Sequence, residues 1–148
     1  MYDARKLKPR INVTEKAVEC PVLGCAEVVE RQRKTFIRAP EFQCPQHKIY
    51  VSASTFEYED EIDNLLWRGD EDMRLFQAVH EVKRESRMAR ERSEDALTWN
   101  VFRYLEKHSL LARSLAALMG SPVTDPQLIY WSYSAVDRGT WTWLAKAR

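Results

Sequence analysis

Apolar and polar positions alternate in short runs over the first third of this chain. Residues 27–31 (EVVER) alternate with a period of two, which predicts a half-exposed strand. Residues 35–38 and 48–52 contain β-branched and aromatic side chains, and they predict two more strands. Together these runs indicate a small β-rich domain over residues 13–56.

The hydrophobic period changes to that of an α-helix from about Asp72. Leu75, Val79 and Val82 recur at steps of three or four residues, so they share one helical face. The opposite face is densely charged as far as Arg92, and both signs are present. This pattern predicts an amphipathic helix whose outer face is solvated and paired at i and i+4.

A second helix is predicted immediately after this charged stretch. Ser93 is a good N-cap, and Glu94 and Asp95 follow it in the first turn. An apolar stripe then runs along the helix, flanked by Trp99 and Phe102, and we expect the helix aromatics to lie in the core. The stripe comprises Leu97, Val101, Tyr104, Leu105 and His108.

The remaining pattern predicts one more helix and a mixed ending. Ser109 is expected to cap a third helix that stops at Gly120, and apolar residues occupy most faces of this helix, which indicates a buried element. Residues 128–133 are β-branched and aromatic and predict a strand. Residues 137–139 predict a turn, and a helix is expected from Thr140 onward.

The succession of elements predicts an α+β chain, in which a β-rich domain precedes a mainly helical part with one or two strands near its end. We expect a basic arm over residues 1–12, the β-rich domain over 13–56, an acidic linker over 57–72 and the helical part over 73–148. The arm is expected to be solvated, and the alternative is a phosphate-contacting arm. The acidic residues of 57–72 are expected to form a solvated linker and a helix N-terminus, and the alternative is a surface that mimics DNA.

Composition narrows the class of protein but names no partner. Of the 148 residues, 45% are hydrophobic, which is enough for a core, and 30% are charged with a net charge of only +1. The longest apolar-rich stretch, residues 110–119, is interrupted by Arg113 and Ser114 and falls short of the ~20 residues that span a bilayer. The first ten residues are basic and polar, without an apolar run behind them. We therefore expect a soluble, cytoplasmic protein with no membrane partner.

Three cysteines and one histidine form two close pairs, Cys20 with Cys25 and Cys44 with His47. An odd number of cysteines in a cytosolic chain favours metal binding over disulfides. Gly24 permits a tight turn between the first two ligands. Zinc prefers four ligands in a tetrahedron, and four protein ligands leave no position for water. The spacing predicts a structural Zn²⁺ in a zinc ribbon, and the alternative is free buried cysteines beside a surface histidine.

Basic residues interleaved with aromatic side chains give this ribbon a candidate nucleic-acid surface, because cations follow the phosphate backbone while aromatic rings stack on bases. Nearby acidic residues dilute the patch. The candidates are Arg31, Arg33, Lys34, Arg38 and Lys48, with Phe36 and Tyr50 between them. We expect DNA rather than RNA as the nucleic-acid partner, and a protein partner or a second copy of the chain is the alternative.

Residues 94–105 (EDALTWNVFRYL) join an acidic residue, an aromatic residue, Asn and Phe in one helical stretch. This stretch resembles the first helix of restriction-endonuclease-like nucleases, the PD-(D/E)xK superfamily. The strand predicted around residues 128–131 and Trp141 fit the segment that precedes the core of that family, so the resemblance covers about residues 73–148. It implies that Glu94 is the helix carboxylate that faces a metal site, and that Asn100 orders this site.

The catalytic residues of that family are missing from this chain. The chemistry requires an acidic residue on one strand and a (D/E)xK motif on the next, which together hold Mg²⁺. Asp137 falls in a predicted turn, and Leu144 stands where Lys146 needs an acidic partner. We therefore expect the zinc-binding DNA-recognition portion of a longer nuclease in bacterial defence, with any Mg²⁺ site beyond this chain. The alternative is a non-enzymatic zinc-ribbon module that binds nucleic acid or a protein within a larger complex.

Overall fold

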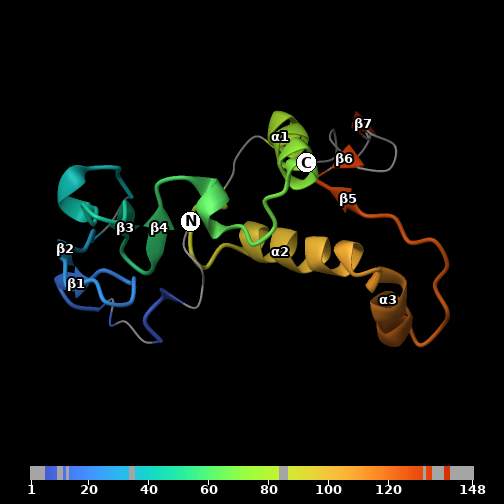
Figure 1. Ribbon diagram of the computed structural model, residues 1–148, viewed down its shortest axis with the longest axis horizontal. Helices are drawn as coiled ribbons and strands as arrows, with labels where there is room; N and C mark the ends of the chain where they lie inside the picture. Colours follow the sequence, from blue (N-terminus) through green and yellow to red (C-terminus); the bar gives the residue numbers. More distant parts are fainter. Residues whose placement is uncertain are drawn as a thin grey trace. The chain divides into compact units, whose positions relative to one another are not determined.

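The described part of the chain in the computed structural model contains short antiparallel strands, three α-helices and two short 3-10 helices, η2 (Pro40–Phe42) and η3 (Glu61–Asn64) (Figure 1). The structure describes residues 6–9, 12, 14–33, 36–83, 87–131, 133–134 and 139–140. Contacts divide the chain into two compact units: unit 1 comprises Met1–Leu65 and Arg87–Ala96, and unit 2 comprises Leu66–Ser86 and Leu97–Arg148. The mixed α+β class predicted from the sequence is confirmed.

The first strand pair of unit 1 follows the alternation of its sequence. Strand β1 (Ala17–Glu19) pairs antiparallel with β2 (Val28–Glu30), and Val18 lies opposite Val29. Both valines are buried while their neighbours on the same strands are exposed. The strand predicted within residues 27–31 is therefore confirmed.

The second strand pair of unit 1 is buried along its whole length. Strand β3 (Ile49–Val51) pairs antiparallel with β4 (Phe56–Tyr58). The predicted strand at 35–38 is wrong for its described residues, 36–38, which have no regular structure. The side-chain amide of Gln32 bonds both the backbone N–H and the backbone carbonyl of Ile37, so a side chain satisfies groups that a strand partner would otherwise satisfy.

The charged stretch 87–92 lies along β4 and is not helical. The Tyr58 N–H donates to the Ala89 carbonyl, and the Glu91 N–H donates to the Phe56 carbonyl, each at 2.9 Å. The prediction that these residues form the outer face of a helix is wrong. Burial of Ala89 and of its neighbour Met88 holds the stretch in unit 1.

Unit 2 contains most of the helical residues, and α2 begins in unit 1. The Gly69 N–H donates to the Asp72 carboxylate at the start of α1. The Ala96 N–H donates to Ser93 Oγ, which confirms the predicted N-cap of α2. The helices are α1 (Asp70–Val82), α2 (Glu94–Lys107) and α3 (Leu111–Met119).

Helix α3 differs from its prediction at its start and in its burial. Ser109 has a φ of 53° and precedes the N-cap, which is Leu110, so the expected Ser109 cap is wrong. Gly120 ends the helix with a φ of 68°, as predicted. Only Leu111 is buried in α3, and Leu118 is exposed, so the expectation of a buried helix is wrong.

Helix α2 packs through a face that the apolar stripe did not predict. Its buried residues are Ala96, Trp99 and Arg103, whereas Leu97 is 64% and Val101 44% exposed. Trp99 is fully buried because its ring packs against Phe76 of α1 and Tyr130 of β5. The prediction that this aromatic side chain lies in the core is confirmed. The predicted stripe is therefore wrong about which side faces the core.

The strand predicted at 128–133 is broken by Trp131, whose φ of 46° turns the chain back on itself. Strand β5 (Ile129–Tyr130) therefore pairs antiparallel with β6 (Tyr133–Ser134), which pairs in turn with β7 (Gly139–Thr140). Gly139 and Thr140 lie in a strand rather than in a turn and a helix. The rest of the predicted turn and helix, residues 137–138 and 141–148, lies outside the described residues.

No helix of the described residues has the length and apolar character that crossing a membrane requires.

Candidate metal centre

The first pair of candidate ligands sits in the loop that joins β1 to β2. Cys20 directly follows β1, and its N–H donates to the Glu27 carbonyl at 2.8 Å. The Cys25 N–H donates to the Val22 carbonyl at 3.1 Å and closes a tight turn. Gly24 occupies the left-handed region within this turn, with a φ of 81°, as its place in the predicted knuckle requires.

The second pair sits in the turn that precedes β3. The Cys44 N–H donates to the Ile49 carbonyl at 2.9 Å, and the Lys48 N–H donates to the Cys44 carbonyl at 2.8 Å. These two bonds close the turn that carries His47. Lys48 has a φ of 56°, so this turn also passes through the left-handed region, here without a glycine.

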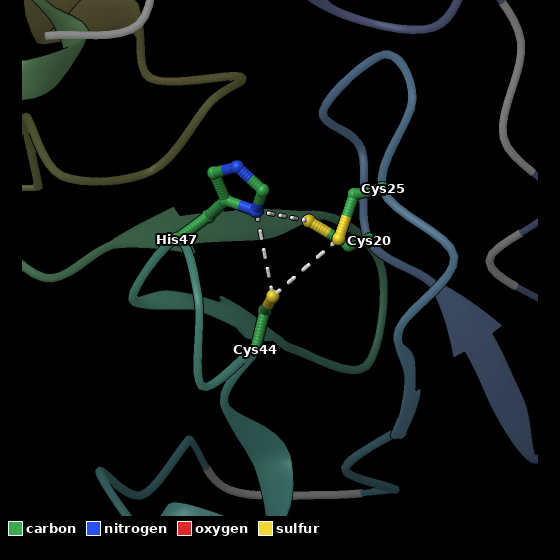
Figure 2. Close-up of side chains that lie close together, drawn as sticks. All are labelled: Cys20, Cys25, Cys44 and His47. Carbon is green, nitrogen blue, oxygen red and sulfur yellow. Dashed lines mark hydrogen bonds between the residues drawn. The ribbon is translucent and has the colours of Figure 1, made fainter.

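The four side chains converge on one point (Figure 2). Nδ1 of His47 lies 3.5 Å from Sγ of Cys20 and 3.7 Å from Sγ of Cys44. The sulfurs of Cys25 and Cys44 are 4.0 Å apart, and all four ligand atoms lie within 4.8 Å of one another. A tetrahedral zinc ion with Zn–S bonds of about 2.3 Å and a Zn–N bond of about 2.0 Å separates its ligand atoms by roughly 3.5–3.8 Å. The cluster is thus positioned like a zinc site.

The three cysteines of the cluster are buried thiols. All three cysteines are buried and free of disulfides. Burial, assisted by the neighbouring thiols of Cys44 and Cys25, raises the pKa of Cys20 to about 12. The thiolate is the form that binds metal, so metal binding at this cluster requires the thiols to release their protons.

A second layer of side chains connects the two ligand loops. Gln46 places Oε1 3.9 Å from Sγ of Cys25, and its Nε2 donates to Oε1 of Glu27 at 2.9 Å. Gln46 comes from the second loop and Glu27 from the first. The contact therefore restrains the loops relative to each other in the neighbourhood of the ligands.

A cleft of about 620 Å³ lies beside His47. Acidic side chains outnumber basic ones along its wall. Its lining comprises Arg38, His47, Lys48, Glu59, Asp60, Glu61 and Asp63.

The structure describes four of the five predicted nucleic-acid residues and places them in different settings. Arg31 donates through Nη1 to the Ala53 carbonyl, and Arg38 donates through Nη1 to the Glu59 carbonyl, each at 2.9 Å. The Arg38 guanidinium also lies 5.9 Å from the Tyr50 ring centre. Arg33 and Lys48 are exposed, and Lys34 lies outside the described residues.

Glu94, the carboxylate implied by the nuclease resemblance, is exposed in the first turn of α2. It lines a second cleft together with Asp95 and a group of arginines. Asn100 accepts two hydrogen bonds from the segment before α1. Its Oδ1 accepts from the Leu66 N–H at 2.7 Å, and its backbone carbonyl accepts from Trp67 Nε1 at 3.0 Å. These bonds attach the segment before α1 to the side of α2.

Sequence reasoning missed a buried ionic network in unit 2. Asp72 and Arg103 are both buried and form an ion pair. Lys107 also pairs with Asp72. Glu106 pairs with Arg103 and accepts a hydrogen bond from the hydroxyl of Tyr130. Burial raises the pKa of Asp72, but the hydrogen bonds and charges of Arg103 and Lys107 outweigh it, so the net pKa is lowered. Burial and the nearby Glu106 raise the pKa of Tyr130. The available signal was the position of Arg103, four residues after Trp99 and seven after Ala96, which places the three residues on one helical face.

Comparisons of the chain with protein-family models, with curated proteins and with solved structures found no match. The resemblance of residues 94–105 to restriction-endonuclease-like nucleases therefore stays a prediction from the sequence.

Proposed function

We propose that Cys20, Cys25, Cys44 and His47 bind one Zn²⁺ that stabilises unit 1 and takes no part in chemistry. The observation that carries this proposal is the set of ligand separations, 3.5, 3.7 and 4.0 Å, which are close to the separations around a tetrahedral zinc ion. Four protein ligands complete the tetrahedron. No coordination position is left for a substrate or an activated water.

The composition of the unit 1 core supports a structural role. Three of the ten described residues in its hydrophobic cluster are the cysteines. The strands around them are only three residues long. Such a small core gains little from apolar burial alone, so the free energy of metal binding would supply much of the stability of the fold.

Zinc content and folding test this proposal together. We expect one zinc per chain by atomic emission, and substitution by Co²⁺ should give the absorption of a tetrahedral thiolate site. Chelation should collapse the amide NMR dispersion of residues 14–65. Cys44→Ser and His47→Ala should each lose the metal, while His47→Cys should keep it because four cysteines also bind zinc tetrahedrally.

His108→Ala is the matched control, because His108 is an exposed histidine of unit 2. This variant should bind zinc like the original chain. A chain that binds no zinc, or whose unit 1 stays folded after chelation, contradicts the proposal.

We further propose that the zinc-stabilised unit recognises DNA, as the recognition portion of a restriction-endonuclease-like nuclease whose catalytic motif is not in this chain. The resemblance of residues 94–105 supports this proposal, as do the exposed cations Arg33 and Lys48 on the unit that holds the metal cluster. In fluorescence anisotropy we expect the zinc-loaded chain to bind duplex DNA with an affinity that falls steeply with salt. With Mg²⁺ present, binding should occur without cleavage.

One observation favours the alternative of a module that binds a protein. Acidic residues outnumber basic ones in the cleft beside His47, which suits a basic protein segment better than a phosphate backbone. Salt-independent or absent DNA binding would leave this alternative as the function of the module.

A further inference from the structure

A cleft of about 360 Å³ lies where the stretch along β4 meets the start of α2. It belongs to unit 1 but lies outside residues 13–56, where the sequence predicts the ribbon and its nucleic-acid surface. Its lining, which we name the arginine cleft, comprises Arg87, Arg90, Arg92, Ser93, Glu94 and Asp95.

The backbone that carries these arginines is held in place from several sides. Besides the two backbone bonds to β4, Thr55 Oγ1 donates to Oε2 of Glu91 at 3.0 Å. Asn64 donates from Nδ2 to the Met88 carbonyl at 2.8 Å. A fixed backbone presents the arginines with less ordering entropy to be lost when a ligand binds.

The arginine side chains of the cleft keep much of their exposure. Arg90 pairs through Nε with Oε1 of the buried Glu57 at 2.8 Å, and its own side chain stays 42% exposed. The Arg92 side chain is 77% exposed, and Arg87 is also exposed. Guanidinium groups stay protonated in proteins and present paired N–H donors that match two phosphate oxygens.

Acidic groups at the cleft offset part of this charge. Asp95 accepts from the backbone N–H of Arg87 at 3.4 Å, and Glu94 is exposed beside it. Oε2 of Glu91 lies 3.6 Å from Nε of Arg92. Three arginines and two carboxylates line the cleft, while Glu57 and Glu91, which pair with Arg90 and Arg92, lie outside its lining.

We propose that the arginine cleft binds phosphate groups of a nucleic-acid backbone. This inference rests on the proposed DNA recognition and moves its principal contacts from the ribbon to residues 87–92. Several guanidinium groups along one short stretch suit a polymer of phosphates, because each contacted phosphate releases condensed cations and adds affinity. In the ribbon, Arg31 and Arg38 each donate to a backbone carbonyl, and Arg38 lines the mainly acidic cleft beside His47.

Substitutions that each remove one positive charge test whether the arginine cleft is where DNA phosphates bind. Arg87→Gln and Arg92→Gln should each weaken binding of the zinc-loaded chain to labelled duplex DNA by about fivefold at low salt. Each should also reduce the salt slope by about 1. Arg113→Gln, which removes the same charge from the exposed face of α3, should leave both quantities unchanged. Circular dichroism and zinc content should be the same for all variants.

A change of opposite sign gives an independent readout. Glu94→Gln removes a negative charge from the cleft, so it should tighten DNA binding about twofold in buffer without Mg²⁺. Weaker binding of this variant would contradict phosphate contact at the cleft. Arg87→Gln and Arg92→Gln with unchanged affinity and slope would overturn the inference and leave DNA recognition standing. A zinc-loaded chain that does not bind DNA at low salt would overturn both.

Discussion

The carboxylate of Asp72 and the guanidinium of Arg103 form a buried ion pair, although 31 residues separate them in the chain. Nε and Nη2 of Arg103 both lie 2.8 Å from Oδ1 of Asp72, and Nζ of Lys107 lies 3.1 Å from Oδ2. The pair joins the first turn of α1 to the middle of α2. It therefore links α1 to α2 within unit 2.

Loss of the Asp72 charge should strongly destabilise unit 2. Asp72→Asn leaves Arg103 buried with a weakened partner, and breaking a buried pair in this way costs about 3 kcal/mol. Glu71→Gln is the matched control: Glu71 also approaches Arg103, at 3.7 Å, but its side chain is 74% exposed, so its loss should cost less than about 1 kcal/mol. Urea unfolding followed by tryptophan fluorescence measures both, and equal effects would contradict this role for Asp72.

The contribution of Asp72 should depend on pH in a defined direction. Its pKa is lowered in the folded state, so its stabilisation is complete above the unfolded value of about 3.9 and is lost as the pH falls through the folded value. The difference in unfolding free energy between the original chain and Asp72→Asn should be constant from pH 7 to about pH 5 and should shrink below about pH 4. Any loss of metal at low pH affects both proteins and cancels in the difference. A difference that grows as the pH falls would refute the sign.

The left-handed turn at Gly24 should matter for metal binding. Its φ of 81° strains any residue with a Cβ, although the space around that Cβ is open. Gly24→Ala should therefore cost about 1–2 kcal/mol and weaken zinc affinity by roughly tenfold in a chelator competition. Gly24→Asn should lose less, because Asn tolerates this region better.

Gly120→Ala separates strain at the metal loop from strain in general. Gly120 also has a positive φ and open space, but it ends α3 in unit 2. This variant should lower stability by a similar amount and leave zinc affinity unchanged. If both glycine variants change zinc affinity alike, the effect does not come from the knuckle.

The orientation of α2 can be tested by two substitutions two residues apart. Trp99 is fully buried against Phe76 and Tyr130, so Trp99→Ala should cost about 3–5 kcal/mol. Leu97 is 64% exposed, so Leu97→Ala should cost less than about 0.5 kcal/mol. Chemical denaturation followed by circular dichroism measures both losses, and a larger loss at Leu97 would restore the predicted stripe as the core face.

Local signals of the sequence predicted those features that depend on a few neighbouring residues. The alternation around Val29, the Ser93 cap and the stop at Gly120 each follow from the conformation or hydrogen bonding of one short segment. The same reasoning failed at residues 36–38, where Gln32 supplies a side-chain alternative to strand pairing. It also failed at Ser109, since the helix starts after Leu110.

By itself, the sequence determined the candidate ligands, because metal-binding loops bring ligands of close spacing together whatever surrounds them. Cys20, Cys25, Cys44 and His47 could be paired from spacing alone, and the structure places their ligand atoms within 4.8 Å. Only the tertiary structure decided which face of α2 is buried, that Asp72 meets Arg103, and that residues 87–92 run along β4. These outcomes depend on partners far away in the chain. A charged residue has the same local signature in solvent as in a buried pair, and only the partner brought by folding distinguishes the two.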